Sequence, residues 1–125
     1  MRLETITPVV LTFNEAPNVR RVLQALSWAH RVVILDSGSD DGTLEIAAGF
    51  PNVSVFSRTF DTHAAQWQHA LASTGIETEW VLAMDADYLA TPGLVEEIRT
   101  LDPPEDVSGY ETSFTYCIHG RPLPG

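Results

Sequence analysis

The sequence predicts an α/β fold: a mostly parallel sheet with helices on both faces, in the order βαβαβαβαβ. Three observations support this prediction. Short continuous apolar runs, which are typical of strands covered on both faces, alternate with segments whose apolar residues recur at helical spacing. Such alternation favours parallel strands joined by helices. The length of 125 residues suits a single domain with a sizeable core.

The first half of the chain contains signals for two strands and two helices. Residues 6–13 are apolar and rich in β-branched residues, and residues 31–36 form a second buried run that ends in an acid. Between them, Pro17 suits the first turn of a helix, and apolar residues follow at i, i+3, i+4 and i+7. These residues are Val19, Val22, Leu23 and Leu26. A polar loop that contains glycine follows the second run, and we expect a short helix over residues 43–49.

The next segments repeat the pattern. Pro51 separates the short helix from a third strand, residues 53–57. Helical spacing then returns at three apolar positions, and Thr74-Gly75 marks the end of this helix. The three positions are Ala64, Trp67 and Leu71. A fourth strand follows at residues 80–84, all of them apolar.

The last predicted helix and strand lie beyond residue 90. Thr91 is a good N-cap and Pro92 a good first residue for a helix with one apolar face. The residues of this face are Leu94, Val95, Ile98 and Leu101. Two consecutive prolines, residues 103–104, stop the helix, and residues 110–118 suit one further strand.

Composition narrows the range of partners and compartments. Lys and Arg total 7 against 17 Asp and Glu, a formal net charge of −10. So acidic a chain is not expected to bind nucleic acid through a basic surface. The only cysteine, Cys117, excludes an internal disulfide and fits a reducing compartment. There is no signal-peptide pattern and no apolar run of about 18 residues, so we expect no exported or membrane-spanning segment.

The most informative residues for function follow the fourth strand. The apolar run over residues 80–84 stops at Asp85, Ala86 and Asp87. In an open α/β sheet, ligands bind at the carboxyl ends of the strands. Residues two apart on a strand point the same way, so Asp85 and Asp87 can converge on one cation or polar ligand. The alternative is a solvated strand end at which aspartate starts a turn.

Polar residues at the ends of the other strands give this pair a context. Strand one ends at Thr12, Phe13, Asn14 and Glu15, and strand two at Asp36. Because the carboxyl ends of parallel strands lie on one edge of a sheet, we expect these groups to meet the Asp85–Asp87 pair. The sequence therefore predicts a binding site at this edge.

Three motifs in this order resemble a known family. TFNE, DSGSDDGT and MDAD, on strands one, two and four, are similar to motifs in the nucleotide-sugar-binding half of family 2 glycosyltransferases, which have the Rossmann-like GT-A fold. In the middle motif, Ser37 replaces the second acid and Asp40 the threonine of the common DDGSTDGT. The segments RTFD and AAQWQHAL also resemble the branch that builds lipopolysaccharide core or other lipid-linked glycans. Gln66 matches that branch, whereas Trp67 and Gln68 depart from it.

The resemblance implies that the edge binds a nucleoside diphosphate-sugar, with UDP-sugar the expected donor. Phe13 would stack on the base, unless it is a core aromatic, while Thr12 and Glu15 would bond the base or ribose. Asp36 would accept from a base N–H or a ribose hydroxyl, with help from Ser37. The alternative for Asp36 is that it caps the loop that follows it. For Asp40 and Asp41 we expect helix capping or solvent exposure.

The resemblance also implies a divalent metal, Mn²⁺ or Mg²⁺. Asp87 is the preferred ligand, and Asp85 would bind the ribose or share the metal, with Ala86 between them in the donor site. Hard cations of this kind prefer oxygen ligands. Arg58, just past strand three, would touch the diphosphate, unless it is a surface or capping arginine. We expect Gln66 and Gln68 to face solvent; the alternative is that they reach the donor sugar.

A transferase of this kind needs more than a donor site. An inverting enzyme needs a base to deprotonate the acceptor, here a glycan or a lipid-linked glycan. In the family this base lies beyond the last strand seen here, so we expect residues 1–125 to be one donor-binding domain that ends before the acceptor region. The catalytic residue is then unknown. The expected location is cytoplasmic, at the inner face of the membrane, with peripheral attachment through further regions.

Two other interpretations stay open. The chain could be a non-catalytic module that binds a nucleotide-sugar without transferring the sugar. It could also be a phosphatase of the haloacid-dehalogenase type, whose signature is likewise an apolar strand ending in Asp-x-Asp. That family prefers Thr or Val where this chain has Leu89, and it places the motif on the first strand, whereas here it follows the fourth.

Overall fold

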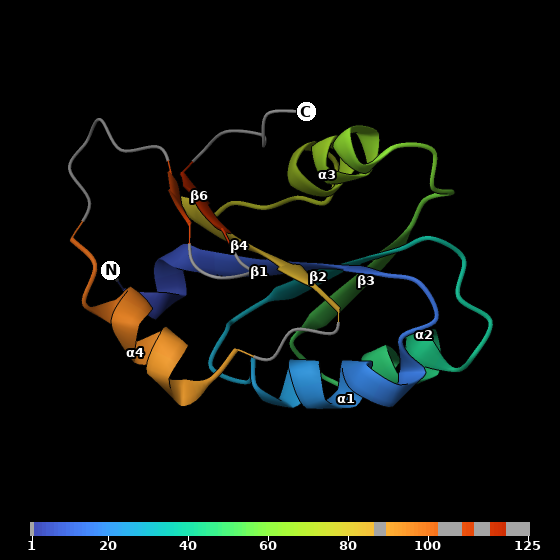
Figure 1. The fold of residues 1–125 in the computed structure, drawn as a ribbon, viewed down its shortest axis with the longest axis horizontal. Helices are drawn as coiled ribbons and strands as arrows, with labels where there is room; N and C mark the ends of the chain where they lie inside the picture. Colours follow the sequence, from blue (N-terminus) through green and yellow to red (C-terminus); the bar gives the residue numbers. More distant parts are fainter. Residues whose placement is uncertain (1, 87–89, 103–108, 112–115, 120–125) are drawn as a thin grey trace.

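The described residues of the computed structural model form one six-stranded sheet (Figure 1). The described residues are 2–86, 90–102, 109–111 and 116–119. The strand order is β3-β2-β1-β4-β6-β5, and β1 to β4 are parallel. The strands are β1 (Ile6–Thr12), β2 (Val32–Asp36), β3 (Val53–Ser57), β4 (Trp80–Asp85), β5 (Gly109–Glu111) and β6 (Tyr116–His119).

Helices cover both faces of this sheet, as expected from the alternating pattern. Figure 1 shows α3 on one face and α1, α2 and α4 on the other. Their bounds are α1 (Ala16–Gln24), α2 (Thr43–Ala48), α3 (His63–Ala72) and α4 (Pro92–Arg99), with a short 3-10 helix, η1 (Leu3–Thr5), before β1. The predicted α/β class, a Rossmann-like sheet with crossover helices, is confirmed.

The core consists of two apolar clusters, one on each face. Successive residues of a strand point to opposite faces, so Val10 packs with α1, α2 and α4 whereas Val9 packs with α3. The first cluster is the larger and includes Leu23 and Ile98. Trp67 of α3 packs against the second cluster, as expected for one of the three apolar positions at helical spacing in this segment. Burial on both faces explains the continuous apolar runs of β2 and β4.

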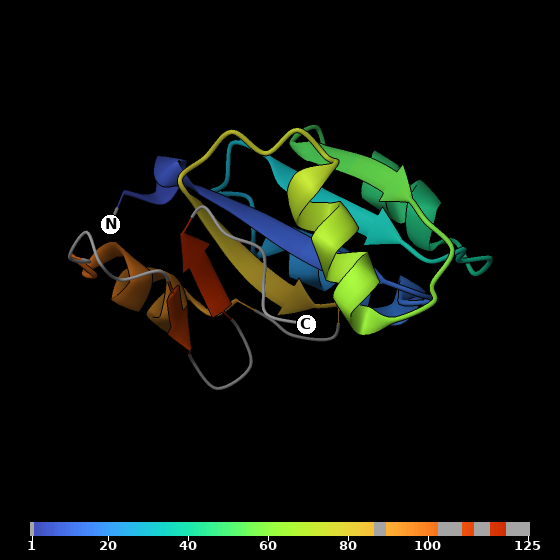
Figure 2. The same ribbon diagram turned by 90° about the horizontal axis from the view of Figure 1, so that it is seen from above.

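The C-terminal part of the sheet differs from the prediction. Residues 110–118 were expected to form one strand, but the described residues form two, β5 and β6, which pair antiparallel. In addition, β6 runs antiparallel to β4, with Trp80 opposite His119 (Figure 2). An antiparallel edge on an otherwise parallel sheet is common in α/β folds. The core of parallel strands that carries the candidate site is unaffected.

Local chemistry explains where the helices begin. The Oγ1 of Thr91 accepts a hydrogen bond from the Leu94 N–H, so the predicted cap of α4 is confirmed. Thr62 caps α3 in the same way through Ala65. Gly42 precedes α2 with φ of 98°, a conformation that favours glycine. Among the described residues, no helix is both long and apolar enough to cross a membrane.

Candidate functional site

Strand register brings the predicted site residues to one edge of the sheet. Thr12 lies opposite Asp36 on β2, and Leu11 lies opposite Asp85 on β4. Because β1 lies between β2 and β4, the carboxyl ends of all three strands form a continuous rim. The convergence predicted from the parallel topology is therefore present for Thr12, Asp36 and Asp85.

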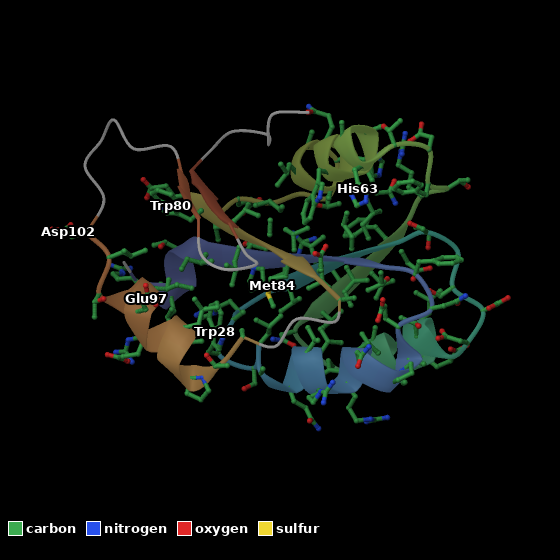
Figure 3. All side chains as sticks on the ribbon, in the orientation of Figure 1. Trp28, His63, Trp80, Met84, Glu97 and Asp102 are labelled. Atoms are coloured by element: carbon green, nitrogen blue, oxygen red, sulfur yellow. The ribbon has the colours of Figure 1, made fainter. Side chains whose placement is uncertain are left out.

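A cavity of about 320 Å³ opens at this rim. It is lined by Leu11, Thr12, Phe13, Glu15, Ser37, Phe60, His63, Gln66, Asp85 and Ala86. Six of these ten residues were predicted from the sequence. Figure 3 shows one of the others, His63, on α3 and above the sheet. The lining thus comes from the ends of β1, β2 and β4 and from the start of α3.

Phe13 was expected either to stack on a ligand or to belong to the core. It is 57% exposed, so it is not a core residue. Phe60, also on the cavity lining, is 45% exposed, and its ring meets that of His63 edge to face at 5.4 Å between centroids. An exposed aromatic ring beside a cavity can pack against a planar ligand group. Phe13 and Phe60 are therefore candidates for contact with a planar ligand group.

Asp36 is fully buried, at 0% exposure, and it organises the loop that follows β2. Its Oδ1 accepts from the hydroxyls of Thr12 and Ser39, both at 2.6 Å, and its Oδ2 accepts from the backbone N–H groups of Gly38 and Ser39 at 2.9 and 2.7 Å. Burial acts to raise the pKa of Asp36, but these four hydrogen bonds outweigh it and hold the pKa below its ordinary value. This arrangement matches the alternative in which Asp36 caps the loop; a direct contact with ligand stays a prediction.

The loop after β1 is joined to the loop after β2 by side-chain hydrogen bonds. The N–H of Asn14 donates to Ser39 Oγ, and its Oδ1 accepts from the Asp40 N–H. Asp41 accepts from the N–H of Ala16, the first residue of α1, and from the N–H of Thr43, the first residue of α2. The hydrogen bond from the Thr43 hydroxyl is the main reason that the pKa of Asp41 is lowered. Asp41 therefore caps, as expected, but it serves two helices.

Glu15 lies at the start of α1 and half buries its side chain beside the cavity. Its N–H donates to Thr43 Oγ1, and its Oε2 accepts from Asn18 Nδ2 at 3.1 Å. Because a carboxylate has about four acceptor positions, Glu15 keeps capacity for a ligand hydroxyl. This position suits the role predicted for Glu15.

Arg58 is engaged within the protein. Its guanidinium donates to both oxygens of Asp61, at 3.0 and 3.3 Å, and its Nη1 donates to Gln66 Oε1 at 2.8 Å. The hydrogen bond from Arg58 is the main reason that the pKa of Asp61 is lowered. Neither Arg58 nor Asp36 is among the described residues that line the cavity. A contact between Arg58 and a diphosphate remains a prediction.

The expectation that Gln66 faces solvent is wrong. Gln66 is 0% exposed and contributes to the cavity wall. It can be buried because its amide is hydrogen-bonded to Arg58 and Ser37. The sequence signal for it was present: residues that follow β3 return to the same edge as those that follow β1, β2 and β4. Phe60 and His63 lie within six residues of the end of β3 at Ser57, so the same reasoning could have identified them.

Asp85 is exposed at the end of β4, and its position on the cavity wall is the one predicted for a ligand-binding carboxylate. Its predicted partner Asp87, together with Leu89, lies outside the described residues. Within the described residues, no group of three or more His, Cys, Asp and Glu gathers into a metal site. The structure therefore leaves the metal prediction open.

A larger cavity, of about 690 Å³, lies where the strands begin. Its lining includes Trp28, His30, Asp102 and the cationic residues Arg2 and Arg99. Figure 3 shows Trp28 and Asp102 well away from His63. Since open α/β sheets bind ligands at the carboxyl ends of their strands, we assign the functional role to the smaller cavity.

Solved structures with the same fold include proteins from two bacteria. Residues 1–349 of S. aureus TarS match with a TM-score of 0.62 and 22% identity, over 75% of this chain and 31% of that one. M. tuberculosis glucosyl-3-phosphoglycerate synthase, in complex with Mn²⁺, UDP and phosphoglyceric acid, matches with a TM-score of 0.61 and 23% identity, over 78% of this chain and 39% of that one. The chain thus spans about a third of the length of these structures, and the likeness concerns the fold.

The family itself is identified from the sequence match. The model of the family described as Glycosyl transferase family 2 matches residues 7–105, which run from β1 past the end of α4 and include all the residues predicted for the site. The match covers most of the chain. The chain belongs to glycosyl transferase family 2.

Proposed function

We propose that this chain is the donor-binding part of a glycosyltransferase. It binds a nucleoside diphosphate-sugar, with UDP-sugar as the expected donor, in the cavity at the carboxyl ends of β1, β2 and β4. The observation that carries the proposal is this 320 Å³ cavity, which combines an exposed aromatic ring, Phe13, with carboxylates from Glu15 and Asp85. Family membership and the shared fold of UDP-bound structures support the same choice of ligand.

Each side chain has a task that suits its position. Phe13 stacks on the base, because its ring is exposed beside the cavity. Glu15 accepts hydrogen bonds from ribose hydroxyls through its remaining acceptor positions. Thr12 and Asp36 act together: the Thr12 hydroxyl donates to Asp36, and Asp36 holds the loop that presents Ser37 to the cavity. In this proposal Asp36 acts mainly through the loop.

The donor set is suited to a hard divalent cation, Mn²⁺ or Mg²⁺. Asp85 offers an exposed carboxylate at the cavity, and Asp87 is the proposed second ligand. The cation, when bound, supplies Lewis-acid stabilisation of the charge that develops on the leaving diphosphate. A complex of a structural neighbour that contains both Mn²⁺ and UDP supports this choice. Without a cation, Glu15 and Asp85 would repel the diphosphate.

The acceptor and the catalytic base belong to polypeptide outside these residues in our proposal. The acceptor is a glycan or lipid-linked glycan, and the transfer inverts the anomeric configuration, with a base from the remaining polypeptide. The segment of Arg58, Asp61 and Gln66 favours the branch that acts on lipopolysaccharide core or similar glycans. We place the reaction in the cytoplasm, at the inner face of the membrane, in agreement with the single cysteine.

Calorimetry with UDP tests this proposal. The wild-type chain is titrated with UDP in the presence of Mn²⁺ and again after chelation by EDTA. We expect binding that weakens about tenfold or more without metal, because a contact to a charged group contributes about 1.5–3 kcal/mol. Asp87→Ala should weaken binding to a similar degree in Mn²⁺ and respond little to EDTA.

Glu97→Ala is the matched control. It removes an exposed carboxylate from α4, on the face away from His63 (Figure 3), and should leave UDP affinity unchanged. An absence of UDP binding by the wild-type chain in every condition would refute the proposal. UDP binding that is equally tight with and without metal would refute the role of the cation alone.

A further inference from the structure

Gln66 is a buried amide whose hydrogen-bonding groups all have partners. Its Oε1 accepts from Arg58 Nη1 at 2.8 Å. Its Nε2 lies 3.1 Å from the backbone oxygen of Arg58 and 3.1 Å from Ser37 Oγ. The side chain therefore connects the end of β3 to the loop after β2, from a position on α3.

Arg58 determines which end of this amide is oxygen and which is nitrogen. A guanidinium can only donate hydrogen bonds, and a backbone carbonyl can only accept them. Because Arg58 contacts Gln66 with both groups, the oxygen must face the guanidinium and the nitrogen must face the carbonyl. The usual ambiguity of amide orientation is thus resolved by a single neighbouring residue. Asp61 in turn holds the guanidinium through both of its carboxylate oxygens.

This orientation fixes the polarity of Ser37. The Nε2 of Gln66 can only donate, because its lone pair is delocalised into the carbonyl, so the Ser37 hydroxyl must accept there and must direct its own hydrogen elsewhere. No hydrogen bond within the described part of the chain uses that hydrogen. The N–H of Ser37 is occupied, since it donates to the backbone oxygen of Thr12 at 3.0 Å. Because Ser37 lines the cavity, its O–H is the donor that it can offer to a ligand.

We propose that Gln66 is a positioning residue that orients Ser37, so that Ser37 donates a hydrogen bond to an acceptor oxygen of the bound nucleoside diphosphate. The inference rests on the proposed donor site. The proposal predicts a preference for ligand oxygens that accept hydrogen bonds. An acid at position 37 would not provide this preference, because a carboxylate can only accept. Asp61, Arg58, Gln66 and Ser37 then form a chain of hydrogen bonds that ends at the ligand.

The polarity is tested with three substitutions of Ser37, measured by calorimetry with UDP and Mn²⁺. Ser37→Ala should weaken binding about three- to tenfold, the effect of one hydrogen bond. Ser37→Thr keeps the hydroxyl and should bind within about threefold of wild type. Ser37→Asp should bind more weakly than Ser37→Ala, because it sets an acceptor against an acceptor. Ser57→Ala, at an exposed serine that ends β3, is the control and should have no effect.

Two smaller probes identify the oxygen that accepts. If Ser37→Ala weakens the binding of uridine, the acceptor belongs to the nucleoside; if it weakens only pyrophosphate with Mn²⁺, the acceptor is a phosphate oxygen. Uridine also removes the repulsion between the Ser37→Asp carboxylate and the diphosphate. Unchanged binding by Ser37→Ala, or binding by Ser37→Asp as tight as wild type, would overturn the inference while leaving the proposed function intact. A wild-type chain that binds no UDP would instead remove the proposed function.

Gln66→Glu tests the positioning role. A carboxylate keeps the Arg58 guanidinium as partner but cannot donate, so the Ser37 hydroxyl would turn toward it and away from the ligand. We expect a loss of UDP affinity similar to that of Ser37→Ala, and no additional loss when the two substitutions are combined. A general structural defect would instead weaken binding equally in both backgrounds, which would overturn the positioning role. Urea midpoints establish that each variant is folded, and the Ser37 series decides the polarity by itself.

Discussion

Replacement of Asp36 by asparagine separates a loop-organising role from a direct role in binding. The carboxylate accepts four hydrogen bonds in a fully buried position. In Asp36→Asn the amide can place its oxygen on the backbone N–H groups of Gly38 and Ser39 and its nitrogen on the hydroxyls of Thr12 and Ser39, which can accept. The geometry is therefore retained, and the change removes the charge.

The magnitude follows from those contacts. A hydrogen bond to a charged group contributes about 1.5–3 kcal/mol and a neutral one about 0.5–1.5 kcal/mol, so each of the two backbone contacts loses about 1 kcal/mol. We expect Asp36→Asn to reduce the free energy of unfolding by about 2 kcal/mol at pH 7. With a urea m-value of about 2 kcal/mol/M, the midpoint should fall by about 1 M. Tryptophan fluorescence and circular dichroism can follow this transition.

The effect should depend on pH in a definite direction. The pKa of Asp36 is lowered in the folded state, so its stabilisation is fully present above the unfolded pKa of about 3.9 and is lost as pH falls through the folded pKa. The difference in stability between wild type and Asp36→Asn should therefore be constant from pH 7 to about pH 5 and then shrink toward pH 3. Equal stability of the two proteins at pH 7, together with loss of UDP binding, would show that Asp36 contacts the ligand directly and would refute this reasoning.

Three further substitutions test separate parts of the structure. Phe13→Leu should change the free energy of unfolding by less than about 0.5 kcal/mol, since Phe13 is 57% exposed, but should weaken UDP binding at least about fivefold through lost stacking. Val55→Ala, at an exposed residue of β3, is the control. An unchanged affinity of Phe13→Leu for UDP would exclude Phe13 from the site. Thr91→Ala should lower the free energy of unfolding, measured by urea denaturation, by about 1 kcal/mol, because it removes the cap of α4. Thr91→Ser keeps a capping hydroxyl and should be as stable as wild type. Equal urea midpoints for wild type, Thr91→Ala and Thr91→Ser would show that the cap contributes nothing. Leu82→Ala should cost about 2–5 kcal/mol because it leaves a cavity in the sheet core, and a midpoint close to that of wild type would contradict the packing described for β4.

The parallel part of the fold was predictable from the sequence because each pattern that marks a strand or a helix start has one physical cause. Strands covered on both faces must be apolar throughout, and the runs that became β2 and β4 are. The helix starts at Pro17 and Thr91 follow from backbone chemistry that tertiary packing did not override. The antiparallel strands β5 and β6 were missed because residues 110–118 contain no Gly, Pro, Asn or Asp, so no turn signal divides them.

The site was predictable to the extent that it follows from topology. Parallel strands bring Thr12, Asp36 and Asp85 to one edge whatever their side chains do. The exposure of a side chain does not follow from the topology. Phe13 could have been buried, and only tertiary packing leaves it exposed. Likewise Gln66 was expected in solvent because glutamine is mostly exposed, and its burial depends on partners eight and 29 residues away in sequence, Arg58 and Ser37. Hydrogen-bond networks of this kind leave no periodic pattern of residues in the sequence.

The central claim is that the carboxyl ends of β1, β2 and β4 form the nucleotide site. Mapping of UDP binding by ¹H–¹⁵N NMR of the full chain, with and without Mg²⁺, tests it most directly, because the candidate cavity and the 690 Å³ cavity lie at opposite ends of the strands. We expect the amides of Phe13, Ser37 and Asp85 to shift on addition of UDP. Shifts confined to Trp28, His30 and Arg99, at the other end of the sheet, would contradict the claim.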